Sequence, residues 1–142
     1  IYGPGQMPMY IVPQVLSQIK ENHHIEIRNG TVMRDLLFVE DCIDAVLKLA
    51  VTDAAQDNVF NIGSGHIVSI TDVAKAAIEA SGLQGVEITD LEEKIAYSPT
   101  AIMADIDKVQ AIIDWFPKTT LKDGLKKMWD AMENANGTGI IR

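Results

Sequence analysis

Apolar residues along the chain recur at a spacing of two in some segments and of about 3.6 in others, the pattern of mixed strands and helices. This alternation predicts an α/β fold. A first helix is expected with Pro13 in its first turn, where the missing amide hydrogen is tolerated, and with its end near Asn22. The apolar face of this helix consists of Val12, Val15, Leu16 and Ile19.

Short apolar segments predict the strands. Ile25–Arg28 alternates apolar and polar residues like a half-buried strand, and Asn29-Gly30 turns the chain into a second extended run over 31–39. Val59–Ile62 is short, apolar and stopped by Gly63-Ser64-Gly65, which predicts a buried strand that enters a glycine turn. The next strand candidate is Val86–Thr89.

A second helix is predicted over Asp41–Ala50. Asp44 and Lys48 are four residues apart and are expected to form an ion pair on its outer face. The side chains expected to face the core are Ile43, Val46, Leu47 and Ala50.

Capping residues mark a third helix. Ser69 and Asp72 have the spacing of a capping box, in which the hydroxyl satisfies a free amide of the first turn. The helix that follows should end at Gly82, because glycine readily adopts the left-handed conformation of a C-terminal cap.

Two further helices are predicted near the end of the chain. Asp105 can cap a short helix through Ile113, which Trp115-Phe116-Pro117 ends. Thr120 and Asp123 open the last helix by the same capping pattern, and the chain after Asn134 is expected to fray. The core side of the last helix consists of Leu121, Leu125, Met128 and Met132.

Composition narrows the class of protein. The chain has 142 residues, of which 47% are apolar and 23% charged, as in a soluble globular domain with a real core. Its net charge of −8 argues against a nucleic-acid surface, which needs clustered lysine and arginine. The single cysteine, Cys42, excludes an internal disulfide, fits a reducing compartment, and lies among apolar residues as a core thiol rather than a nucleophile.

The first six residues, Ile1-Tyr2-Gly3-Pro4-Gly5-Gln6, fit the end of a buried strand that runs into a tight turn. The sequence contains no signal-type segment, and it starts directly on apolar residues without a capping residue before them. We therefore expect this sequence to be a piece of a longer polypeptide.

Four sets of residues follow one another in a recognisable order. The first three are Tyr2–Gln6, Met33–Asp41 and Phe60–Gly65; the fourth joins Ala104–Lys108, Asp114–Lys118 and Leu121–Leu125. Together they resemble the C-terminal portion of an extended short-chain dehydrogenase/reductase, of the NAD-dependent nucleotide-sugar epimerase/dehydratase family. Each motif occurs in many folds, but their order and spacing cover nearly the whole chain.

The resemblance implies a Rossmann-type parent protein. Residues 1–6 would be a remnant of the Rossmann strand and turn, 7–135 the substrate-binding portion, and 136–142 a flexible tail. The parent would be a cytoplasmic isomerase or lyase that transiently oxidises a sugar hydroxyl with tightly held NAD. NAD would be bound mainly by an N-terminal Rossmann half, and the substrate would be a sugar nucleotide or a related small molecule, with no nucleic-acid or membrane partner.

Two other hypotheses remain. The chain could be a stand-alone, non-catalytic binding or structural module derived from the family, or part of a relative that acts on a small non-nucleotide carbonyl.

Arg34 is the first candidate substrate-binding residue. Its planar guanidinium can bind two phosphate oxygens at once, and it lies between a polar turn and an apolar strand. In the family that this sequence resembles, the arginine at the position of Arg34 contacts the diphosphate of the sugar nucleotide. The alternative is a surface ion pair with Asp35 or Glu40.

Asn61 is the second candidate, because it ends a predicted strand where open α/β sheets usually bind ligands. It could instead cap its loop, with Gly63 and Gly65 serving turn geometry alone. By resemblance, Gly3 and Pro4 would touch the nicotinamide end of NAD, although a rigid turn needs no ligand. The family also places residues of the 7–12 segment over the nucleotide.

Other polar and aromatic residues receive structural assignments. His23 and His24 point apart on a helix end and have no third ligand at metal-binding spacing, and His66 is assigned to a surface loop. Glu40-Asp41 and Glu92-Glu93 are interpreted as helix-start and solvated carboxylates rather than an acid/base pair. Trp115 and Trp129 are expected to anchor the core.

Two family features are missing from this sequence. No strand leads through a glycine-rich turn into a helix, and Gly63-x-Gly65 alone does not replace that turn. The family's catalytic tyrosine precedes a lysine by four residues, whereas Tyr2, Tyr10 and Tyr97 precede Gln6, Gln14 and Ala101. We therefore assign no catalytic residue, and expect the chain by itself to be inactive.

A second departure concerns the substrate. Many relatives carry a further arginine before the Ala104–Lys108 pattern, where this chain has Lys94 and the sequence up to Thr100. An ammonium group is a point charge rather than a fork, so this position gives weaker support for a nucleotide.

Overall fold

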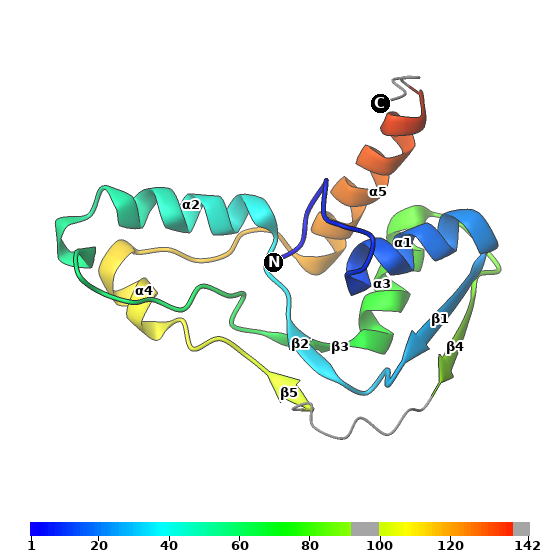
Figure 1. The fold of residues 1–142 in the computed structure, drawn as a ribbon, viewed down its shortest axis with the longest axis horizontal. Coiled ribbons are helices and arrows are strands. Elements are labelled where there is room, and N and C mark those ends of the chain that lie inside the picture. Colours follow the sequence, from blue (N-terminus) through cyan, green and yellow to red (C-terminus); the bar gives the residue numbers. More distant parts are fainter. Residues whose placement is uncertain (92–99, 138–142) are drawn as a thin grey trace.

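The structure, a computed structural model, describes residues 1–91 and 100–137 (Figure 1). The fold is α/β, as predicted. No helix among the described residues has both the length and the apolar character needed to cross a membrane. The helical elements are α1 (Ile11–Asn22), α2 (Val39–Ala50), η1 (Asp53–Ala55), α3 (Ile70–Ser81), α4 (Asp107–Ile113) and α5 (Leu121–Gly137). The strands are β1 (His24–Arg28), β2 (Met33–Asp35), β3 (Ile67–Ser69), β4 (Glu87–Leu91) and β5 (Ala101–Ile102).

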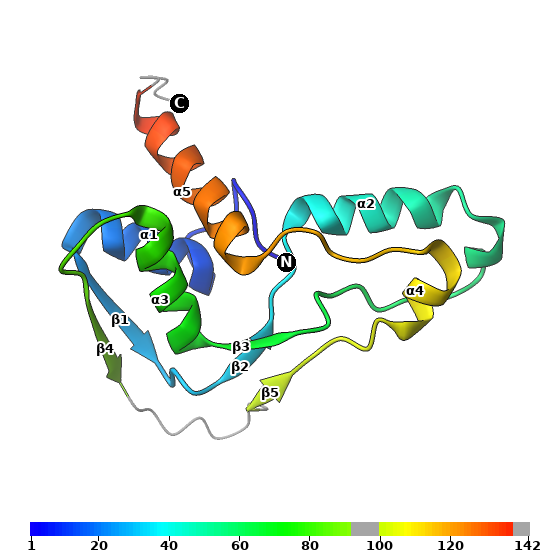
Figure 2. The same ribbon diagram turned by 180° about the vertical axis from the view of Figure 1, so that it is seen from behind.

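The elements form two lobes, each with its own core. Figures 1 and 2 show α1, α3 and α5 beside β1 and β4, whereas α2 and α4 lie together at the other end of the molecule. The buried residues of the larger core come from Tyr2, Phe38, α1, β1, α3 and α5, and include Trp129. Those of the smaller core are Leu37, Ala45, Ile106, Val109 and Trp115. Each core therefore holds one tryptophan, as expected for two core anchors.

The strands form two small sheets rather than one. Strand β1 pairs in parallel with β4, while β2 lies between antiparallel β3 and parallel β5. The turn at Asn29-Gly30 is present, with Asn29 at φ 56°, but it leads β2 into the second sheet instead of back along β1. Of the extended run predicted over 31–39, only Met33–Asp35 forms a strand, and Val39 is already the first residue of α2.

Local signals set several helix ends as predicted. The Ser69 hydroxyl accepts a hydrogen bond from the Asp72 amide (3.0 Å), and α3 ends at Gly82 with φ 72°. The Thr120 hydroxyl likewise accepts from the Asp123 amide (3.1 Å) at the start of α5. Helix α5 continues to Gly137, so the predicted tail over 136–142 lies mostly outside the described residues.

The predicted orientation of α2 is wrong. Its buried residues are Asp41 and Ala45, whereas Ile43, Val46 and Leu47 are 51%, 49% and 62% exposed and Ala50 is also exposed. The helix turns Ala45 inward because the smaller core takes a small side chain there, with half-buried Cys42 packed beside it. The opposite face is apolar and uncovered by any described residue. The predicted ion pair between Lys48 and Asp44 forms (3.1 Å).

The strand predicted at Val59–Ile62 is also absent. The segment is irregular and Val59 is 84% exposed, because no described strand lies beside it to complete backbone hydrogen bonds. The Lys108 ammonium holds the segment instead, by donating to the Val59 carbonyl (2.9 Å) and lying over the Phe60 ring (4.8 Å to its centroid).

The N-terminal segment joins the larger core through Tyr2. The predicted strand end is reduced to a single parallel bridge with Phe38, whose ring meets that of Tyr2 edge-on at a centroid distance of 5.4 Å. The predicted turn follows it, closed by a hydrogen bond from the Gln6 amide to the Gly3 carbonyl (3.2 Å). The Tyr2 hydroxyl makes a long hydrogen bond to the Leu121 carbonyl (3.5 Å), against α5.

Gly124 in α5 leaves the space that the Tyr2 ring occupies. A Cβ atom at position 124 would overlap the Tyr2 hydroxyl and lie 2.7 Å from the ring carbon that carries it. We expect Gly124→Ala to lower the free energy of unfolding by about 1–3 kcal/mol through overpacking, measured by urea denaturation. Adding Tyr2→Phe should recover part of the loss. A gain of about 1 kcal/mol, which the helix propensity of alanine alone would give, would contradict this packing.

Burial raises the pKa of the Tyr2 phenol above its ordinary value of 10.0, and the nearby carboxylates of Asp41 and Asp123 raise it further. The phenol holds its proton more tightly in the folded chain than in the unfolded chain, so its contribution to stability is complete below about pH 10 and falls as the pH rises further. We expect Tyr2→Phe to remove that part of the alkaline loss of stability. If the free energy of unfolding of the two proteins falls in parallel from about two pH units below to about one unit above the phenol's ordinary value, the phenol is not buried.

Candidate functional site

The two predicted substrate-binding residues lie in one cleft, here called the Arg34 cleft, of about 490 Å³. It is lined by Ile1 at the N-terminal end of the chain and by three walls: the β2 region, the irregular segment at 60–63, and β5 with the residues after it. The lining residues are Ile1, Arg34, Asp35, Leu37, Phe60, Asn61, Ile62, Gly63, Ile102, Met103 and Ala104. The fold thus brings Arg34 and Asn61 together from positions 27 residues apart in the sequence (61 − 34).

Arg34 occupies the middle of β2, where its backbone is fixed by pairing with Val68 on one side and Ile102 on the other. The side chain is half-buried, and its guanidinium donates to the Met33 carbonyl (2.8 Å). The two carboxylates considered as surface partners bind other donors. Glu40 accepts from the Lys127 ammonium (2.5 Å), and Asp35 accepts four hydrogen bonds from elsewhere. Arg34 itself lines the cleft, with its backbone fixed by the strands on both sides.

Asp35 is the residue whose importance the sequence did not reveal. Its Oδ1 accepts from the Ser64 amide (2.7 Å) and the Ser64 hydroxyl (2.6 Å). Its Oδ2 accepts from the amides of Gly65 (3.2 Å) and Ala104 (3.1 Å). A Gly-Ser-Gly turn does present successive amides that need an acceptor, but the sequence cannot say that a carboxylate 29 residues earlier supplies it.

The glycines of this turn serve local geometry. A Cβ atom at position 63 would lie 2.5 Å from the Ala104 Cβ and 2.6 Å from the Asp35 carboxylate, and Gly65 has φ 72°. Because the Ser64 and Gly65 amides already donate to Asp35, the turn does not offer them to a phosphate. Asn61 lies just before the turn, exposed at the cleft rim.

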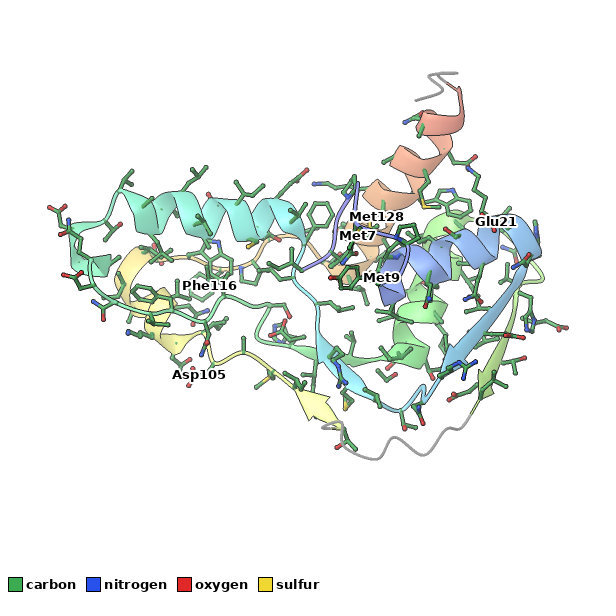
Figure 3. All side chains as sticks on the ribbon, in the orientation of Figure 1. Met7, Met9, Glu21, Asp105, Phe116 and Met128 are labelled. Carbon is green, nitrogen blue, oxygen red and sulfur yellow. The ribbon has the colours of Figure 1, made fainter. Side chains whose placement is uncertain are left out.

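The predicted cofactor-binding residues line a separate hollow of about 210 Å³. Gly3 and Pro4 lie there beside Val39, and a Cβ atom on Gly3 would be 2.9 Å from the Val39 Cβ. Ile1 lines both this hollow and the Arg34 cleft, so the two adjoin. The 7–12 segment follows, with Met7 and Met9 exposed over the larger lobe (Figure 3).

His66 lies on an exposed loop, as predicted, and borders two further clefts. One, of about 360 Å³, lies against the start of α5; the other, of about 680 Å³, includes Asp105 and Phe116. Figure 3 shows Asp105 and Phe116 in the lobe of α2 and α4. The Ser64-Gly65 turn separates these clefts from the Arg34 cleft.

Asp41 departs from its expected role as a solvated carboxylate. It lies in the first turn of α2, as predicted, but is buried and accepts hydrogen bonds from the amides of Lys118 (3.2 Å) and Thr119 (2.9 Å). These bonds attach the segment before α5 to the start of α2. The other predicted solvated pair, Glu92-Glu93, lies outside the described residues, as does Lys94.

The described residues contain no metal cluster, and their two tyrosines differ in exposure. No group of three or more histidine, cysteine or carboxylate side chains within 1–91 and 100–137 could hold a metal ion. His23 is the left-handed cap that ends α1. Tyr2 is buried against α5, Tyr10 is half exposed, and Tyr97 is outside the described part of the chain.

Comparison with known proteins identifies the family. The family model for the NAD dependent epimerase/dehydratase family matches residues 1–63. A UDP-glucose epimerase of Bacillus subtilis, described as uncharacterized, is 27% identical over 126 residues, or 88% of this chain. Human dTDP-D-glucose 4,6-dehydratase is 28% identical over 133 residues, or 89% of the chain. The crystal structure of UDP-glucuronic acid 4-epimerase from Bacillus cereus, in complex with UDP-glucuronic acid and NAD, superposes on 94% of the chain with a TM-score of 0.81 and 27% identity.

The chain belongs to the NAD-dependent epimerase/dehydratase family.

The chain spans only part of its family relatives. It covers 39% of the Bacillus subtilis protein, 37% of the human dehydratase and 43% of the Bacillus cereus epimerase. The α/β fold seen here thus corresponds to part of a Rossmann-type epimerase or dehydratase.

Proposed function

We propose that this chain is the substrate-binding part of an NAD-dependent epimerase or dehydratase that acts on a sugar nucleotide. The observation that carries the proposal is the meeting of Arg34 and Asn61 in one cleft, at the edge of β2. A guanidinium can bind the oxygens of a diphosphate in a fork, and a nearby amide can accept from and donate to sugar hydroxyls.

The net charge of the chain supports the proposed role of Arg34. The chain has a net charge of −8, so a dianionic ligand would be repelled by most of its surface. Among the described residues that line the cleft, Arg34 is the one cationic side chain, and the one carboxylate, on Asp35, already accepts four hydrogen bonds. The cleft therefore provides a local cationic site on an acidic protein.

NAD itself fits the described residues poorly. The Ser64 and Gly65 amides of the Gly63-x-Gly65 turn donate to Asp35, and the hollow at Gly3 and Pro4, about 210 Å³, can receive no more than one edge of a dinucleotide. We therefore propose that NAD is held mainly by residues other than those described, with Gly3 and Pro4 lining its nicotinamide end. No chemical step is assigned to this chain.

The uncovered face of α2 supports a Rossmann half as the partner. Ile43, Val46 and Leu47 are spaced as one helical stripe, and Val59 is also exposed. Both features were predicted to be buried, and a further domain packed here would bury them. A stand-alone module would leave this apolar stripe in water, which soluble proteins generally avoid.

The diphosphate role predicts the effect of changing Arg34. In the full-length polypeptide we expect Arg34→Ala to weaken binding of a sugar nucleotide by about 1.5–3 kcal/mol, or roughly 10- to 150-fold. Arg34→Lys should recover only part of the affinity, because an ammonium lacks the planar fork. UDP-glucose, UDP-glucuronic acid and dTDP-glucose would be tested by calorimetry, with Arg28→Ala, an exposed arginine of β1, as the control. Equal affinity for Arg34→Ala and the unchanged protein would favour a small non-nucleotide substrate.

The partner proposal predicts the surface behaviour of the chain by itself. Residues 1–142 should bind a fluorescent dye that reports exposed apolar surface, and Val46→Lys with Leu47→Lys should reduce this signal. Stability should change by no more than about 0.5 kcal/mol, since both side chains are exposed. Met9→Lys, which changes a more exposed apolar residue of the other lobe, is the control and should change the signal less. Absence of dye binding would favour the stand-alone module.

A further inference from the structure

We infer that Asp35 is a positioning residue for ligand binding in the Arg34 cleft, acting by holding two loops against β2. The inference rests on the proposed function, because it concerns the same cleft. Asp35 itself is not expected to touch the ligand. Its two oxygens offer about four acceptor sites, and four donors from Ser64, Gly65 and Ala104 already use them.

The loops held by Asp35 form the walls of the cleft. Ser64 and Gly65 directly follow the wall residues 60–63, which include Asn61. Ala104 ends the wall formed by Ile102 and Met103. Arg34 is the residue immediately before Asp35 on β2, so a single carboxylate fixes the positions of both loop walls relative to the strand that carries the guanidinium.

Close packing makes this arrangement hard to replace. Gly63 admits no side chain, since a Cβ atom there would press on both Ala104 and Asp35. The segment 60–63 has no strand beside it in the described part of the chain, so its backbone gains no sheet pairing. Charge-assisted hydrogen bonds to Asp35 therefore supply much of the order at the Asn61 side of the cleft.

Asp41 provides a matched control within the same chain. It is also a carboxylate that accepts backbone amides from a distant loop, those of Lys118 and Thr119, but it does not line the Arg34 cleft. At either site, replacement by asparagine exchanges one of the two accepting oxygens for an NH2 group, which cannot accept a hydrogen bond. Both variants should lose stability, whereas only Asp35→Asn should disturb the cleft.

The experiment measures ligand affinity and stability together in the full-length polypeptide. With the tightest-binding of UDP-glucose, UDP-glucuronic acid and dTDP-glucose, Asp35→Asn should raise Kd at least about tenfold, and Asp41→Asn by less than about twofold. Ser64→Ala removes the hydroxyl that donates to Asp35 (2.6 Å), so it should raise Kd by a smaller factor. This variant provides the test if Asp35→Asn does not fold. An unchanged Kd for the folded Asp35→Asn or Ser64→Ala protein, or an equal rise for Asp41→Asn, would overturn the inference.

Amide hydrogen exchange separates failure of this inference from failure of the proposed function. If Arg34→Ala binds the sugar nucleotides as well as the unchanged protein does, the proposed function fails. Asp35 is then judged by exchange at Gly63, Ser64, Gly65 and Ala104, which should become at least about tenfold faster in Asp35→Asn and stay unchanged in Asp41→Asn. Unchanged exchange in Asp35→Asn would refute the positioning role whatever the ligand.

Discussion

The carboxylate of Asp35 is the interaction on which the arrangement of the cleft depends. It joins β2, the Ser64-Gly65 turn and the segment after β5, which come from three distant parts of the sequence. Asp41 makes a similar connection between α2 and the segment before α5. The chain passes repeatedly between its two cores, and these two carboxylates hold several of the passing segments together.

Several other carboxylates form surface ion pairs with lysines, but these two side chains accept hydrogen bonds from backbone amides. An acceptor of this kind stabilises irregular backbone that no sheet or helix can satisfy. The cleft is therefore built mainly from loops whose geometry is set by one residue, with only short strands β2 and β5 at its base. This explains how a site can be defined on a three-stranded sheet only two or three residues long in each strand.

The sequence predicted what depends on neighbours along the chain. Helix α3 begins at Ser69 and stops at Gly82 because a hydroxyl and a glycine act within one turn of the helix. The orientation of α2 and the strand at Val59–Ile62 were predicted wrongly, because burial depends on what covers a segment, and the described residues leave Ile43, Leu47 and Val59 exposed. The roles of Asp35 and Asp41 escaped prediction for another reason: their partners lie 29 to 78 residues away. Family resemblance favoured Arg34 as a ligand-binding residue, whereas Asn61 was selected as the end of a predicted strand, and periodicity alone would not have paired them.

The contact between Tyr2 and α5 has a consequence for how the chain folds. The Tyr2 ring packs on Phe38 near the beginning of the sequence, yet its hydroxyl meets the Leu121 carbonyl, 119 residues later. Because a chain emerges from the ribosome N-terminus first, the larger core cannot close until α5 has been synthesised. Until then Tyr2 and α1 lack one wall of their packing, and this slow, long-range closure exposes apolar surface during synthesis.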